Sequence, residues 1–177
     1  MQLNAINAPA RSFHRGQVYN PPTIEEKSQE AQQDYSVQLA KPFDVESVEF
    51  RIDGQVKEYQ GKWIARVVAY VDARTIQDRL DDVLGTDTWA FSVQMVPGAS
   101  YATIGTLTIG GIAKSDCGED ETVKGAVSDA LKRAAVMWGI GRYLYRLPNL
   151  FAECEKRGNS WQIKKDELVK LRSKLPQ

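Results

Sequence analysis

The stretch DETVKGAVSDALKRAAVMWGIGRYLYRLP, from Asp120 to Pro148, decides how the rest of the chain is interpreted. At about 100° per residue its apolar side chains fall on one side of a helix, so that side is predicted to pack against a sheet. Gly139 and Gly141 mark the end of this helix, and Pro148 closes the segment. The predicted apolar side consists of Val123, Val127, Ala130, Leu131, Ala134, Met137 and Trp138.

The other side of the predicted helix carries a row of polar residues. Lys124, Ser128 and Lys132 recur every four residues along one flank, and Arg133 lies on the opposite flank. From residue 124 to residue 146 there are five basic side chains and one acidic side chain, Asp129. Two interpretations stay open: an ordinary solvated face in which Asp129 pairs with Arg133, or a local patch that contacts nucleic acid.

Charge and flat rings alternate after the helix. Arg142 and Arg146 enclose Tyr143 and Tyr145. The arginines extend the basic patch. The tyrosines are predicted to pack in the core, with stacking on a base as the alternative.

Composition limits the classes of protein to which this chain can belong. Its 177 residues, 42% of them hydrophobic, suffice for one domain with a proper core. Lys plus Arg equals Asp plus Glu at 23 each, so any attraction to nucleic acid must be local. Cys117, Cys154 and the single histidine, His14, cannot form a tetrahedral metal site, and both thiols are expected to be free. Without an apolar run of membrane-spanning length, a cytoplasmic, nucleoid-associated protein is expected.

Residues 1–35 are rich in Asn, Gln and Pro and predict a flexible N-terminal arm, with a short helix from Thr23 to Gln33 as the alternative. An antiparallel hairpin is predicted next, from Ser47–Ile52 and Trp63–Val71 with its turn at Asp53-Gly54. Asp72 to Gly85 then predicts an amphipathic helix that ends at the glycine.

A second hairpin is predicted from Trp89–Val96 and Tyr101–Ala113. Its second strand has many small residues, which favours a bulged edge strand; close approach by another backbone or by nucleic acid is the alternative. Residues 117–121 predict a loop. The tail, residues 153–177, has Trp161, Ile163, Leu168, Leu171 and Leu175 and predicts a short amphipathic helix packed on the same domain, with nucleic-acid contact as the alternative.

Carboxylates cluster on and just past the helix predicted from Asp72 to Gly85. Two or three of them holding a divalent metal would make a nuclease, whereas a solvated acidic face explains them with fewer assumptions. Arg74, near the start of the same helix, is a further candidate for contact with nucleic acid. The cluster consists of Asp72, Asp78, Asp81, Asp82 and Asp87.

Three runs of the sequence resemble the deinococcal DNA damage response A (DdrA) family, a bacterial branch of the single-strand annealing superfamily typified by the eukaryotic Rad-fifty-two recombination mediators. These runs are VDARTIQDRLDDVLGTDTWAFSVQMVPG, TLTIGGIAKSDCGED and SDALKRAAVMWGIGRYLYRLP, and the resemblance covers about Val37 to Leu150. It implies an α+β fold in which an antiparallel sheet, made of two hairpins, packs on a long amphipathic helix. It also implies an annealing core over residues 36–152 and a homo-oligomeric ring.

The resemblance further implies which residues line an inner groove for single-stranded DNA. Lys124, Ser128, Lys132 and Arg133 match basic or hydroxyl positions of the family, and Arg74 matches a further arginine. The chain departs from the eukaryotic pattern at Val136, where those relatives have another arginine. With Arg142 and Arg146 added from the basic patch, these seven residues are the predicted nucleic-acid contacts.

The function expected from these observations is binding of single-stranded DNA in recombinational repair, either to protect ends or to anneal complementary strands. No phosphate-binding glycine loop occurs in the sequence, so neither ATP nor another cofactor nor a catalytic residue is expected. The expected partners are single-stranded DNA, further copies of the chain, and a recombinase or single-strand-binding protein. A metal-dependent nuclease and a purely structural scaffold are the alternatives.

Overall fold

The computed structural model describes Thr23 and residues 35–176. The predicted arm over residues 1–35 and the alternative helix from Thr23 to Gln33 lie outside these residues, apart from Thr23 and Tyr35. Residues 35–40 are helical. The elements that follow are η1 (Val45–Ser47), β1 (Val48–Ile52), β2 (Lys57–Tyr59), β3 (Lys62–Val71), α2 (Ala73–Leu84), β4 (Trp89–Met95), β5 (Ala102–Ile109), β6 (Ile112–Glu119), α3 (Val123–Met137), η2 (Arg142–Arg146), β7 (Leu150–Arg157), β8 (Ser160–Ile163) and α4 (Lys165–Arg172).

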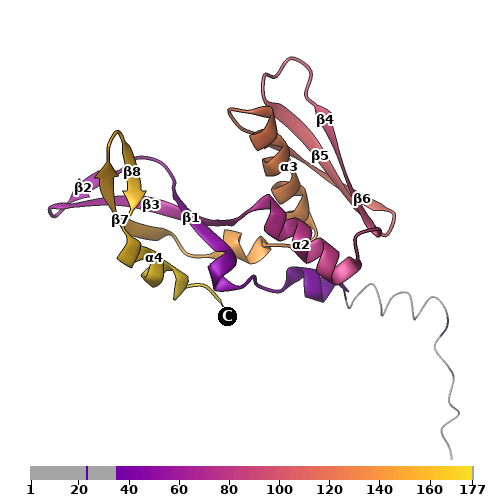
Figure 1. Cartoon of the computed structure of the whole chain (residues 1–177), viewed down its shortest axis with the longest axis horizontal. Helices are drawn as coiled ribbons and strands as arrows, with labels where there is room; N and C mark the ends of the chain where they lie inside the picture. The colour runs from indigo at the N-terminus through magenta and orange to yellow at the C-terminus, as the bar shows by residue number, and fades with distance from the viewer. Residues whose placement is uncertain (1–22, 24–34, 177) are drawn as a thin grey trace, which may run out of the picture.

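The fold is α+β with antiparallel strands, as predicted, but the two hairpins lie in two separate sheets. One sheet has the order β1-β3-β7-β8, and β2 pairs with the other end of β3. The other sheet has the order β4-β5-β6. Figure 1 shows the first sheet with α4 in one lobe and the second sheet with α3 in the other, joined at the base of the view by α2 and η2.

The first predicted hairpin is confirmed, but its turn is elsewhere. β1 pairs with the second half of β3, from Val48 opposite Val71 to Ile52 opposite Val67. The tight turn lies between β2 and β3, where Gln60 and Gly61 both have positive φ. Asp53 and Gly54 instead mark a bend between β1 and β2.

The second predicted hairpin continues into a third strand. Tyr101–Ala113 is not one strand, because Gly110 and Gly111, both with positive φ, turn the chain from β5 into β6. The prediction of a loop at residues 117–121 is therefore wrong for Cys117 to Glu119, which belong to β6. β5 is the central strand of its sheet and not the edge strand that its small residues favoured.

Small residues of β5 and β6 let α3 lie very close to the sheet. A Cβ atom added at Gly118 would lie 2.2 Å from the backbone nitrogen of Ala130 and 2.3 Å from the backbone oxygen of Ala126. Thr103 is buried and donates a hydrogen bond from its hydroxyl to that same Ala126 oxygen at 3.1 Å. Another backbone does approach this sheet, as in the alternative proposed for the strand Tyr101–Ala113, but the approach is made by the chain's own helix and is tightest at Gly118 on β6.

The buried side of α3 differs from the predicted one. Ala130, Leu131 and Ala134 are buried as expected, but Val123 and Met137 are exposed at the two ends of the helix. Ala126 and Ala135 replace them in the core. The contact with the sheet is therefore made largely by alanines.

α2 begins and ends where the sequence predicts. The Asp72 side chain caps it by accepting a hydrogen bond from the Arg74 N–H, and Gly85 ends it with φ 85°. Arg79, on the same helix, holds the segment that leads into β1. Its guanidinium donates to the carbonyls of residues 38, 39, 41 and 42 and lies 4.3 Å above the centre of the Phe43 ring.

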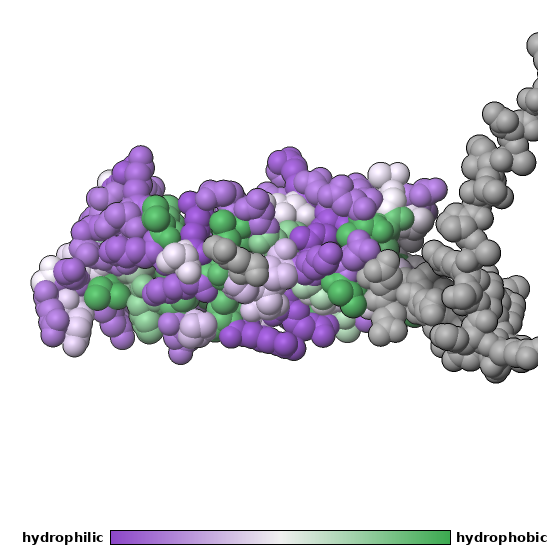
Figure 2. Space-filling view, turned by 90° about the horizontal axis from the view of Figure 1, so that it is seen from below, coloured by the Kyte–Doolittle hydropathy of each residue, from purple (hydrophilic) through white to green (hydrophobic). Residues whose placement is uncertain are grey.

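The tail belongs to the first sheet. The boundary expected at residue 152 falls inside β7, which pairs with β3, and Trp161 and Ile163 lie on β8 and not on a helix. Leu171 and Leu175 are buried, which confirms that the helical part of the tail packs on the rest of the chain. The side seen in Figure 2 shows scattered apolar residues among hydrophilic ones. None of the helices in the described part is long and apolar enough to span a membrane.

Candidate nucleic-acid interface

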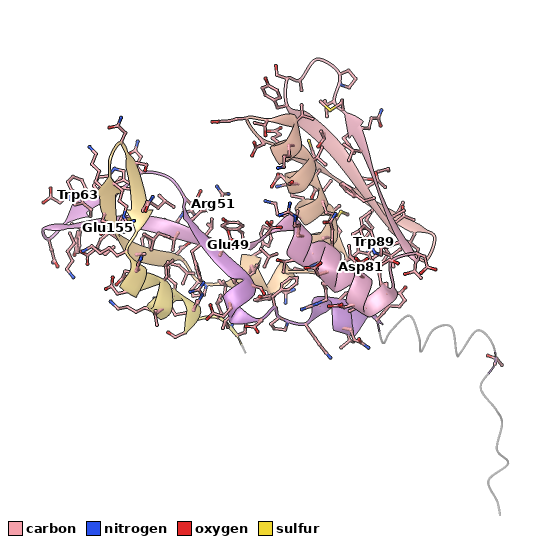
Figure 3. All side chains as sticks on the ribbon, in the orientation of Figure 1. Glu49, Arg51, Trp63, Asp81, Trp89 and Glu155 are labelled. Carbon is pink, nitrogen blue, oxygen red and sulfur yellow. The ribbon has the colours of Figure 1, made fainter. Side chains whose placement is uncertain are left out.

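A cleft of about 730 Å³ lies between the first sheet and α3. Its sheet side is formed by β1 and β3 and its helix side by α3 and η2. Figure 3 shows Arg51 and Glu49 on β1 beside the space between the two lobes. The charged and aromatic side chains that line the cleft are Arg51, Asp53, Arg66, Tyr70, Glu119, Asp120, Asp129, Lys132 and Tyr145.

The sheet side follows from strand alternation. Alternate residues of β3 point to one face, so Arg66, Val68 and Tyr70 share the face opposite to buried Val67 and Val71. Residues opposite each other on paired strands share a face as well, and Arg51 is paired with Val68. The two paired strands thus place two arginines and a tyrosine on one surface.

The helix side follows from helical spacing. Asp129, Lys132 and Val136 recur at three and four residues along α3, and all three line the cleft. The Lys132 Nζ lies 3.7 Å from the Asp129 Oδ1 and 5.8 Å from the centre of the Tyr70 ring on β3. The Lys132 ammonium therefore reaches from one wall of the cleft toward the other.

Tyr70 stays uncharged between these groups. Its hydroxyl donates a 2.5 Å hydrogen bond to Glu49 Oε2. Partial burial, together with the hydrogen bond and the negative charge of Glu49, raises the pKa of Tyr70 to about 12. At neutral pH the ring therefore offers a neutral flat surface beside Lys132.

Lys132 is the predicted contact that the structure places in the cleft. Ser128 lies one turn before it and is half-buried, and Lys124 lies two turns before it and is exposed. Arg133 points to the other side, where its Nε lies 3.3 Å from Asp116 Oδ1 on β6. The predicted pair between Asp129 and Arg133 is therefore replaced by two pairs, Lys132 with Asp129 and Arg133 with Asp116.

The other predicted arginines do not line the cleft. The Arg142 Nε donates to the Val136 carbonyl at 2.8 Å, so this side chain closes the C-terminal end of α3. Arg74 and Arg146 are exposed on α2 and η2. Among the tyrosines of η2, Tyr143 packs in the core as predicted and accepts a hydrogen bond from the Phe43 N–H, whereas Tyr145 is 70% exposed.

Sequence reasoning missed the sheet side of the cleft, namely Arg51, Arg66 and Tyr70. A signal was present on β1, where apolar and polar residues alternate, and at Arg66, which lies between two buried apolar residues of β3. The alternation places Arg51 on the face opposite to Phe50, and Arg66 on the face opposite to Val67.

The cleft is not uniformly basic. Arg51, Arg66 and Lys132 line it together with the carboxylates of Asp53, Glu119, Asp120 and Asp129. Arg66 is paired with Asp53, and Asp120 accepts a hydrogen bond from the backbone N–H of Thr122 at the start of α3. A phosphate group that enters must therefore compete with carboxylates already bound to two of the three cations.

The acidic cluster of α2 does not assemble into a metal site. In the part of the chain that the structure describes, no group of three His, Cys, Asp or Glu side chains lies where it would hold a metal ion. Asp72 is used as the helix cap, and Asp81 accepts a 2.8 Å hydrogen bond from the Trp89 indole N–H. Figure 3 shows the Asp81 and Trp89 side chains together near the end of α2. The geometry gives the nuclease alternative no support.

Comparison with known proteins finds similarity over part of the chain. Residues 98–161, from the turn before β5 into β8, match the Rad52/22 family of double-strand break repair proteins. The chain is 43% identical over 121 residues to the single-stranded DNA-binding protein DdrA of Deinococcus deserti, covering 65% of this chain and 58% of that protein. It is 47% identical over 95 residues to the DdrA of Deinococcus radiodurans, covering 50% of this chain and 45% of that protein. The matches thus span about half the length of these relatives. The chain is therefore similar to the DdrA proteins over part of its length, and residues 98–161 match the Rad52/22 family.

Proposed function

We propose that this protein binds single-stranded DNA in the cleft between β3 and α3 and thereby acts in DNA repair. The observation that carries the proposal is the position of Lys132, whose ammonium lies over the Tyr70 ring in a cleft also lined by Arg51 and Arg66. Both named relatives are single-stranded DNA-binding proteins, which supports the same ligand.

The cleft offers groups for both parts of a nucleotide. Lys132, Arg51 and Arg66 would neutralise phosphates, and the Tyr70 ring offers a flat surface for a sugar or a base. Such contacts follow the backbone, so binding would be largely independent of sequence. Lys132 and Arg66 would give up a carboxylate partner when they bind phosphate. Each would therefore contribute less to the free energy of DNA binding than an unpaired cation would.

The remaining predicted residues would act outside the cleft. Lys124 and Ser128 continue the line of Lys132 toward the start of α3, and Arg74 and Arg146 are exposed cations on α2 and η2. Arg133 has to leave Asp116, and Arg142 is held by a backbone carbonyl, so these two would contribute least.

Annealing needs no ATP and no catalytic group in this scheme. Stacking of the new base pairs drives the pairing of complementary strands, and the protein holds one strand extended. Protection of ends would follow from the same contacts. We expect the protein to act at the nucleoid, in the cytoplasm, beside a recombinase or a single-strand-binding protein.

Several copies would extend the site, and the second sheet offers a surface for their assembly into a ring. β4 and β6 are its edge strands, and β4 (WAFSVQM) has no charged residue and no proline to prevent pairing with another chain. Edge pairing between different strands of neighbouring copies is heterologous, which closes into a ring when the rotation between copies permits.

The test is fluorescence anisotropy with labelled single-stranded and duplex DNA over a salt series. Wild type is expected to prefer single strands. Lys132→Ala should weaken binding by about 1 kcal/mol and lower the salt slope by about one unit, because one phosphate contact is lost. Lys165→Ala is the matched control, since that exposed lysine lies on α4. Equal affinities for wild type and Lys132→Ala would refute the cleft as the binding site.

A further inference from the structure

The surface that forms one wall of the cleft continues along the first sheet. One face of this sheet is covered by α4, where Leu171 packs with Val67, Leu150 and Ala152. The alternate residues point to the other face, which is the face that carries Arg66 and Tyr70. This second surface, called here the open face, runs from the cleft to the far end of the sheet at β2.

A second groove of about 780 Å³ lies on the open face. Tyr59 and Lys57 of β2, Ile64 of β3 and Phe151 of β7 line it. Asp53 and Arg66 line both this groove and the cleft, so the two hollows adjoin at these residues. A chain that leaves the cleft past Arg66 therefore enters the groove directly.

Aromatic rings on the open face stand beside cations. The Tyr59 side chain is 63% exposed and the Phe151 side chain is 56% exposed. Tyr59 is paired with Lys62 across β2 and β3, and Phe151 is paired with Arg66 across β3 and β7. Cross-strand neighbours have Cβ atoms about 5 Å apart, so each exposed ring has the stem of a basic side chain beside it, while the charged ends of Lys62 and Arg66 lie at Glu153 and Asp53.

We propose that the open face is a second binding segment for the same DNA strand, in which Tyr59 and Phe151 stack on bases while Lys62 and Arg66 contact the adjoining phosphates. This proposal rests on the function proposed for the cleft. Proteins that hold single strands without sequence preference use aromatic rings, which stack on any base, together with cations, which contact the phosphates.

A second copy of the chain is a less suitable occupant of the same face. The core of a protein interface is depleted in lysine and glutamate, and the rings here are surrounded by Lys57, Glu58 and Lys62. Lys62 is paired with Glu153 at 3.4 Å and Arg66 with Asp53, and burying these pairs against protein would remove their water without providing new partners. A phosphate backbone provides such partners.

The length of β3 makes the proposal testable with oligonucleotides of different lengths. Tyr70, in the cleft, and Ile64, in the groove, are six residues apart, which corresponds to about 20 Å along the strand. An oligonucleotide of about 5 nucleotides is expected to occupy the cleft alone, whereas one of about 20 nucleotides would cover both segments.

The experiment measures anisotropy of labelled oligothymidylates of these two lengths with the double variant Tyr59→Ala/Phe151→Leu. We expect about a thirtyfold loss of affinity for the long oligonucleotide, since stacking on two bases is lost, and no change for the short one. The matched control Tyr59→Phe/Phe151→Tyr keeps both rings and should bind like wild type. Both residues are exposed, so circular dichroism melting curves should be the same for all three proteins.

Three results would overturn the proposal. The first is binding of the long oligonucleotide by the double variant with wild-type affinity, and the second is an equal loss of affinity for both lengths. A change in its subunit number by light scattering, in step with the loss of binding, would make the open face an interface between copies. Lys132→Ala tests the cleft separately. It should weaken binding of the short oligonucleotide whether or not the open face contributes, so the proposal for the open face can fail while the proposal for the cleft stands.

Discussion

The contact of α3 with the second sheet and that of α4 with the first sheet are made by different kinds of residue. α3 lies on β5 and β6 through glycine and alanine, with Gly118 directly beneath the backbone of Ala126 and Ala130. α4 lies on the first sheet through Leu171, whose large side chain packs with Val67 and Leu150. The first contact fixes a backbone at one distance, whereas the second fills a volume. The helix that is fixed in this way is the one that carries Lys132.

Gly118→Ala is the strongest way to break the α3 contact. The new Cβ would meet two backbone atoms of α3 at 2.2 Å and 2.3 Å, and backbone cannot rotate away, so the helix itself must move. We expect the free energy of unfolding to fall by about 3 kcal/mol or more, the upper end for overpacked cores. Urea unfolding followed by circular dichroism measures this.

Gly105→Ala is the matched comparison, because its Cβ would meet the Phe91 ring at 2.7 Å and the Ala130 side chain at 2.8 Å. The Phe91 ring is half-buried and can shift, so the loss of stability should be smaller than for Gly118→Ala. The reverse order would contradict the explanation that backbone contact sets the position of α3.

Leu171→Ala tests the other contact. Leu171 is buried, and its truncation removes apolar contacts and leaves a cavity, which lowers the free energy of unfolding by about 2 to 3 kcal/mol. Because α3 is not involved, the variant that remains folded should bind DNA with nearly the affinity of wild type. Val169→Ala, on an exposed side of α4, is the control and should have little effect. A loss of DNA affinity in folded Leu171→Ala would show that the two helix contacts are not independent.

Arg79→Lys should have a smaller effect, of about 1 to 2 kcal/mol, on the junction between the two regions. The Arg79 guanidinium bonds to four backbone carbonyls between residues 38 and 42, and a lysine ammonium cannot reproduce that planar fork. Thermal unfolding measures the loss, with Arg74→Lys, an exposed arginine of the same helix, as the control. Equal melting temperatures for the two variants would assign Arg79 no part in the junction.

The sequence predicted the elements whose ends have chemical markers. Asp72 and Gly85 bound α2 as expected, and Gly139 with Gly141 ends the segment of α3. β6 was missed because its inward residue Gly118 carries no side chain where α3 touches it. Alternation of apolar residues therefore gave no signal at the place where the packing is closest.

The candidate site was predicted only on its helical side. Lys132 was found because helical spacing relates residues close in the sequence. Arg51 and Tyr70 lie on different strands, and they come to the same face only through the register of β1 with β3. That register depends on the packing of the whole sheet, which short-range patterns do not contain.

The smallest effect is expected from Tyr70→Phe, and its pH-dependent part appears only at alkaline pH. The pKa of Tyr70 is raised from 10.0 to about 12 by burial and by the hydrogen bond to Glu49. Between these values the folded protein keeps a proton that the unfolded chain has lost, so wild-type stability falls as pH rises through this window. Tyr70→Phe has no such proton, and its free energy of unfolding should fall less over the same window. Urea titrations from about pH 8 upward give the difference between the two proteins. In Glu49→Gln the free energy of unfolding should also fall less over this window than in wild type. If the free energy of unfolding of wild type and Tyr70→Phe depends on pH in the same way, Glu49 does not hold the phenol proton.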